Sequence, residues 1–81
     1  MNSPILSEDQ VAVIMVDGAT GHVLTIEGNV YLDDEQAVYL IFDDLESARQ
    51  FIDNKREKDN TIDFSVFDFK NNLVYYRLAG M

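Results

Sequence analysis

Short segments that are either apolar throughout or alternate with a period of two recur along this chain and are separated by polar turns. Residues 11–16 are consecutive apolar residues that run into a turn, which is typical of a strand covered on both faces. Residues 22–28 place Leu24 and Ile26 on one side and Val23, Thr25 and Glu27 on the other, which predicts a half-buried strand close enough to form an antiparallel hairpin with the first. Residues 37–42 are six apolar residues, counting tyrosine, and predict a third strand that places Val38, Leu40 and Phe42 on one face and Tyr39 and Ile41 on the other.

The period changes to that of a helix in the segment that follows the third strand. Its apolar residues recur every three or four positions and form one stripe: Leu45, Ala48, Phe51 and Ile52. Asp43, with Glu46 three residues later, matches a capping box in which Asp replaces the usual Ser or Thr. Basic residues gather at the other end, where they interact favourably with the helix dipole. We therefore predict an amphipathic helix over about 44–58.

The alternating segment 62–67 and the largely apolar segment 73–78 predict a second hairpin. The loop between them contains asparagines, which tolerate the left-handed conformation. The order is β-β-β-α-β-β, which predicts a single α+β domain over 1–81, with 1–9 as an N-terminal arm. We expect a mostly antiparallel sheet with the helix on one face, and a strand after the helix that runs parallel to the strand before it. The pattern does not fix which strands are neighbours.

One helix covers only part of a five-stranded sheet, so we expect a second cover on the other face. That face is expected to carry some of the residues Tyr31, Tyr39, Ile41, Phe67, Tyr75 and Tyr76. Three covers fit the pattern: the N-terminal arm with Pro4, Ile5 and Leu6, a second copy of the protein, or a partner. Tyrosine suits such a face because its ring packs while its hydroxyl stays hydrated.

Charge narrows the classes of partner. The net charge is -9, and no Lys or Arg precedes Arg49. Such a surface repels nucleic acids and anionic membranes and attracts basic proteins, although acidity also serves solubility alone. The chain has no cysteine, no secretory signal pattern and no apolar run of the ~20 residues that span a bilayer. We expect a soluble, cytoplasmic protein.

The acidic clusters at 33–35 and 43–44 raise the question of a metal site. If the residues between them form an extended strand, Asp34 and Asp43 lie about 25–30 Å apart and cannot share an ion. The segment 17–28 also lacks the ligands of an EF-hand loop. We therefore predict no metal and no cofactor. His22 is the only histidine, and nothing marks a serine as an activated nucleophile beside it.

No motif of a known family appears in the sequence. The pattern favours a non-catalytic, acidic protein-interaction module that binds a basic partner or forms a homodimer through its sheet face. It would act as an inhibitor, as an immunity-like protein or as a regulatory subunit. The residues expected to contact the partner are Glu27, Asp33, Asp34, Glu35, Tyr39 and Tyr75. The alternative is a small enzyme or ligand-binding domain with a pocket between helix and sheet near Asp17 and His22.

Overall fold

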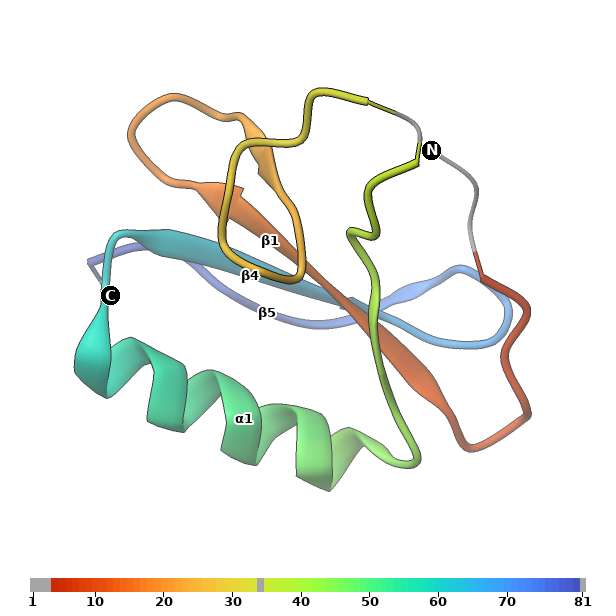
Figure 1. The fold of residues 1–81 in the computed structure, drawn as a ribbon. Coiled ribbons are helices and arrows are strands. Elements are labelled where there is room, and N and C mark those ends of the chain that lie inside the picture. The colour runs from red at the N-terminus through yellow and green to blue at the C-terminus, as the bar shows by residue number, and fades with distance from the viewer. Residues whose placement is uncertain (1–3, 34, 81) are drawn as a thin grey trace.

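The fold is one helix packed against one face of an antiparallel sheet, shown in a computed structural model that describes residues 4–33 and 35–80 (Figure 1). The elements in chain order are β1 (Val11–Asp17), β2 (Val23–Leu24), β3 (Leu40–Phe42), α1 (Leu45–Lys58), β4 (Ile62–Phe67) and β5 (Leu73–Arg77). The predicted α+β class and the order β-β-β-α-β-β are confirmed.

Strand β1 lies at the centre of the sheet. Along its first half it pairs with β3, and near its end it pairs with β2. Its other edge pairs with β4, which in turn pairs with β5, so β5 is the last strand on that side of the described sheet. Because β3 and β4 are both antiparallel to β1, they run parallel to each other, as predicted for the strands on either side of the helix.

The helix begins one residue later than its sequence pattern suggested. Asp44, not Asp43, is the N-cap, and its carboxylate accepts a hydrogen bond of 2.7 Å from the backbone N–H of Ser47. The predicted capping box at Asp43 and Glu46 is therefore wrong, because Asp44 has the extended backbone and the reach to Ser47 that a cap needs. At the other end, Asp59 is the C-cap and its N–H donates to the carbonyl of Lys55.

The core lies between α1 and the inner face of β1 and β4. Phe64 at its centre is fully buried and makes an edge-to-face contact with Phe51, whose ring centroid is 6.4 Å away. Phe51 also packs against Phe42, at 5.3 Å, which joins the helix to β3. The buried members of this core are Val11, Val13, Met15, Leu24, Ala48, Ile52, Ile62, Phe64 and Val66.

The second and third strands are shorter than predicted. Only Val23–Leu24 and Leu40–Phe42 are strands in these two segments, and the described residues between them are mostly irregular. The predicted alternation fails at Thr25, which is 4% exposed, and at Ile26, which is 43% exposed. Thr25 turns inward because its N–H and hydroxyl both bond to the backbone of Asn29, in a turn that includes Gly28 at φ +89°.

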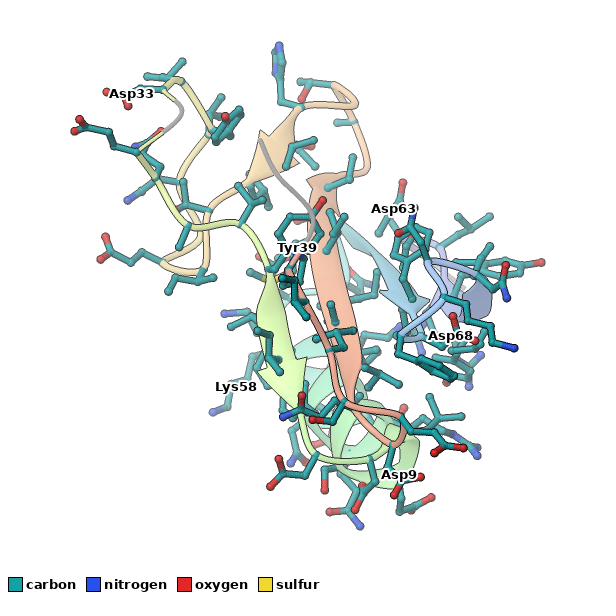
Figure 2. The ribbon with its side chains drawn as sticks, turned by 90° about the vertical axis from the view of Figure 1, so that its right-hand side faces the viewer. Asp9, Asp33, Tyr39, Lys58, Asp63 and Asp68 are labelled. Atoms are coloured by element: carbon teal, nitrogen blue, oxygen red, sulfur yellow. The ribbon has the colours of Figure 1, made fainter. Side chains whose placement is uncertain are left out.

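The outer face of the sheet, opposite α1, is partly covered. Residues 4–10 lie on the side of the sheet away from the helix, and the labelled Tyr39 side chain lies on the same side (Figures 1 and 2). Pro4, Leu6 and Tyr39 are each half-buried, whereas Ile5 is fully exposed. On the same face Ala12, which lies opposite Ile41 and Phe67 in the sheet, is only 2% exposed. The N-terminal arm therefore supplies part of the second cover.

Candidate protein-binding surface

Large apolar side chains remain exposed along β5 and the loop before it. Each is between 42% and 55% exposed, which is high for residues of this size. They are Phe69, Leu73, Val74, Tyr76 and Leu78, and we refer to them as the β5 surface. A cluster of this kind within ten residues, on a protein of this size, is typical of a contact surface.

A tight turn holds β5 against β4. The carboxylate of Asp68 accepts hydrogen bonds from the N–H groups of Lys70 and Asn72, at 3.0 and 2.9 Å. Asn71 adopts the left-handed conformation with φ 64°, as the asparagines of this loop predicted. These local bonds close the turn between β4 and β5, and β5 lies at the edge of the described sheet (Figure 1).

The pairing register divides β5 between two faces. Tyr76 lies opposite Ser65 on the outer face, whereas Tyr75 lies opposite Val66 and Arg77 opposite Phe64, both on the helix face. The register shifts between Val66 and Phe67, which marks a β-bulge at the start of β5. Because side chains alternate along a strand, the outer face of β5 carries apolar side chains, and its helix face carries the charge of Arg77.

Two arginines flank Tyr75 on the helix face. The guanidinium of Arg49, from α1, lies 5.2 Å from the centre of the Tyr75 ring, within the range of a cation–π contact. Arg77 Nε donates a hydrogen bond of 2.9 Å to the Tyr75 hydroxyl oxygen. That hydrogen bond is the main cause that raises the pKa of Arg77, and the nearby carboxylate of Asp53 acts in the same direction. This side of β5 is therefore basic, in an acidic protein.

The predicted acidic contact residues lie at the other end of the molecule. In Figure 2, Asp33 lies beyond one lateral edge of the sheet, and Asp68, in the β4–β5 turn, lies near the opposite edge. Glu27, Asp33 and Glu35 are exposed, and the Asp33 carboxylate accepts a hydrogen bond from the Glu35 N–H at 2.8 Å. Asp34 lies outside the described residues. The structure thus separates these carboxylates from Tyr75, which was grouped with them from the sequence.

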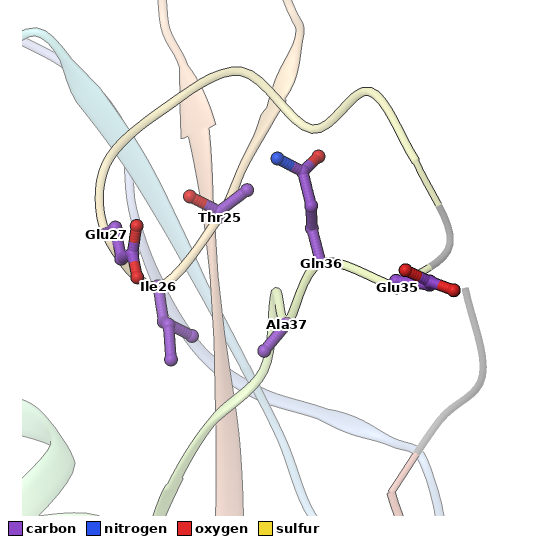
Figure 3. Close-up of a pocket in the computed structure, with 6 residues that line it drawn as sticks. All are labelled: Thr25, Ile26, Glu27, Glu35, Gln36 and Ala37. Carbon is purple, nitrogen blue, oxygen red and sulfur yellow. The ribbon is translucent and has the colours of Figure 1, made fainter.

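A shallow depression of about 200 Å³ lies within the loop between β2 and β3, which carries Glu27, Asp33 and Glu35 and which we call the acidic loop (Figure 3). Glu27 and Glu35 lie at its two ends, with Thr25 and Gln36 between them (Figure 3). A hydrogen bond of 2.9 Å from Ile26 N–H to the Ala37 carbonyl holds the two segments together. The described residues that line it include no histidine, serine or basic side chain, so they offer separated carboxylates and no acid–base pair.

Asp17 and His22, the predicted pocket residues, belong to the β1–β2 turn. The Asp17 carboxylate accepts a hydrogen bond of 2.9 Å from Ala19 N–H, and the Asp17 N–H donates to the His22 carbonyl. These hydrogen bonds stabilise the β1–β2 turn, and the His22 side chain is exposed. Within residues 4–33 and 35–80, no three His, Asp or Glu side chains gather closely enough to hold a metal ion.

The β5 surface was largely missed from the sequence. Tyr76 was expected among the residues of the outer sheet face, but only Tyr75 was named as a contact residue from this strand, and the structure places the Tyr75 ring on the helix face. A signal was present, since residues 73–78 are apolar at every position except Arg77 rather than strictly alternating. In a hairpin that ends a sheet with one covering helix, such a run leaves apolar side chains without cover.

The part of the chain that the structure describes contains no helix with the length and hydrophobicity required to cross a bilayer. Comparison with known proteins identifies no relative, since no protein-family model, no curated protein and no solved structure matches this chain.

Proposed function

We propose that this protein is a non-catalytic binding module that contacts another protein through the β5 surface. The observation that supports this is the exposure of five large apolar side chains in and beside one edge strand. Burying such side chains in an interface contributes about 25 cal/mol per Å² of apolar area, and tyrosine is common among the residues that dominate binding energy. We propose that it acts in the cytoplasm as an inhibitor, as an immunity-like protein or as a regulatory subunit.

The net charge of -9 favours a partner that is basic overall. Long-range attraction raises the rate at which oppositely charged proteins meet, and falls as salt screens the charges. Glu27, Asp33 and Glu35 lie between β2 and β3, which pair with β1 on the side away from β4 and β5, and they contribute to this field without having to touch the partner. Steering by the acidic loop and contact by the β5 surface are thus separate steps.

The test is site-specific crosslinking in native lysate. A photoreactive residue at position 76 should give a defined crosslinked product, and one at exposed position 27 should give none or a weaker one. The same product should be lost in a Leu73→Ser variant. Ile5→Ser is the matched control, because Ile5 is fully exposed and lies outside the β5 surface. Crosslinking that is equal at positions 76 and 27, or unaffected by Leu73→Ser, would contradict the proposal.

A further inference from the structure

Strand β5 has a free edge in the described sheet. It pairs with β4 along one side, and no described strand pairs along the other. A strand of five residues exposes backbone N–H and C=O groups along about 16 Å of such an edge. Proteins that leave an edge open commonly add to it an extended segment from a partner, through main-chain hydrogen bonds. The bulge between Val66 and Phe67 distorts the start of β5, so the regular part of the edge is Tyr75–Arg77.

The side chains beside this edge differ sharply on its two faces. On the outer face, Leu73 and Tyr76 are more than half exposed and apolar. On the helix face, Arg49 and Arg77 flank Tyr75, and Asp53 is the carboxylate that acts on Arg77. An added strand also alternates its side chains between these two faces. Its residues on one face therefore meet apolar groups, and those on the other meet guanidinium groups.

Resting on the proposed function, we infer that the free edge of β5 receives an extended segment of the partner in which apolar and acidic residues alternate. The apolar residues pack beside Leu73 and Tyr76. The carboxylates face Arg49 and Arg77, where charge-assisted hydrogen bonds form with guanidinium groups. Because the whole protein is acidic, this acidic segment belongs to a partner whose overall charge is basic or neutral.

The charges argue against a second copy at this edge. Two copies paired through β5 would place Arg49 and Arg77 of both on the same face of the joined sheet, and their net charges of -9 also repel. Like charges across paired strands are destabilising. An acidic strand meets the arginines with the opposite charge, so charge complementarity selects it over self-pairing.

The first test uses peptides of defined pattern on a carrier domain, measured by fluorescence anisotropy. An eight-residue Val-Glu repeat should bind saturably, with Kd below about 1 mM, and the matched Val-Gln repeat about tenfold more weakly. N-methylation of alternate peptide bonds should abolish binding, because an edge strand binds through main-chain hydrogen bonds. Amide shift changes in NMR spectra should be largest along β5.

The second test changes the arginines. Arg49→Gln should weaken binding of the Val-Glu peptide about fivefold and leave binding of the Val-Gln peptide unchanged. Lys58→Gln is the matched control, since Lys58 is an exposed cation at the far end of the same helix, and it should have no effect. Circular dichroism of each variant checks that the fold is intact.

The outcomes separate this inference from the proposed function. If neither peptide binds, or both bind equally, the inference is wrong, while a crosslink at position 76 would still support the β5 surface. Light scattering that shows a dimer, lost in Leu73→Ser, would place a second copy at this edge and also overturn the inference. Loss of the crosslink, with peptides still bound, would overturn the proposed function alone.

Discussion

Gly18 follows β1 and is packed too closely to accept a side chain. Its N–H donates to the Thr61 carbonyl at 2.9 Å. A Cβ added at this position would lie 2.5 Å from the Ala79 Cβ and 2.8 Å from the Thr61 carbonyl oxygen. Carbon atoms normally approach to about 3.5–4.0 Å. The C-terminal segment cannot move aside freely, because Ala79 N–H bonds to the Asp63 carboxylate at 2.6 Å.

The Gly18→Ala variant should therefore be less stable by about 2 kcal/mol, within the range of about 1–3 kcal/mol for overpacked sites. For a domain of this size that loss lowers Tm by roughly 10 °C. Gly21→Ala is the matched control. Its added Cβ meets open space, but φ is +77°, so only left-handed strain of about 1 kcal/mol is expected.

Urea denaturation followed by circular dichroism measures both variants and a double-mutant cycle. Removing the facing methyl with Ala79→Gly should restore about 1 kcal/mol in the Gly18→Ala background, and nothing in the Gly21→Ala background. The slope of the free energy of unfolding against urea concentration should be the same in every variant. If Ala79→Gly gives no selective recovery, the contact between positions 18 and 79 is not what requires glycine.

Three further predictions concern the caps, the core and metals. Hydrogen bonds from Ser47 lower the pKa of Asp44, and hydrogen bonds from Thr61 lower the pKa of Asp59. The two ionised carboxylates therefore stabilise the fold above pH 3.8, the pKa of the unfolded state. This stabilisation is lost as the pH falls through the lower pKa values of the folded state. Acid titration of Tm should therefore show a shallower loss below pH 3.8 in an Asp44→Asn/Asp59→Asn variant than in the wild type. Phe64→Ala should cost about 3–5 kcal/mol in urea unfolding and leave the domain at best marginally folded, whereas Tyr76→Ala should change stability by less than about 1 kcal/mol. Millimolar calcium, magnesium or zinc should give no saturable rise in Tm, and a large saturable rise would show that the carboxylates do form a site.

The sequence predicted well those elements whose pattern is local. The helical stripe of Ala48 and Ile52 located α1 to within a residue, and the asparagines of the second hairpin indicated the left-handed turn at Asn71. The cap was misplaced because Asp43 and Asp44 are both suitable residue types, and only backbone conformation distinguishes them. Thr25 was assigned to the wrong side because its turn depends on hydrogen bonds with Asn29.

The candidate surface was harder to predict because exposure is a property of the assembled sheet. Tyr75 and Tyr76 are adjacent and chemically identical, yet the register sends one beneath Arg49 and leaves the other 55% exposed. Nothing in the sequence fixes that register or makes β5 the last strand. Glu27, Asp33 and Glu35 are exposed, as an acidic surface requires, but their separation from β5 follows from topology.

The central position of β1 has a consequence for how the chain folds during synthesis. Its partner on one side, β4, begins at Ile62, so about 45 residues must be translated after Asp17 before that pairing can start. At about 5–20 residues per second, this takes roughly 2–9 s. During that time the most apolar strand of the protein has only β2 and β3 as partners on the nascent chain. Ribosome-bound chains that stop before β4 are therefore the species on which chaperones should act.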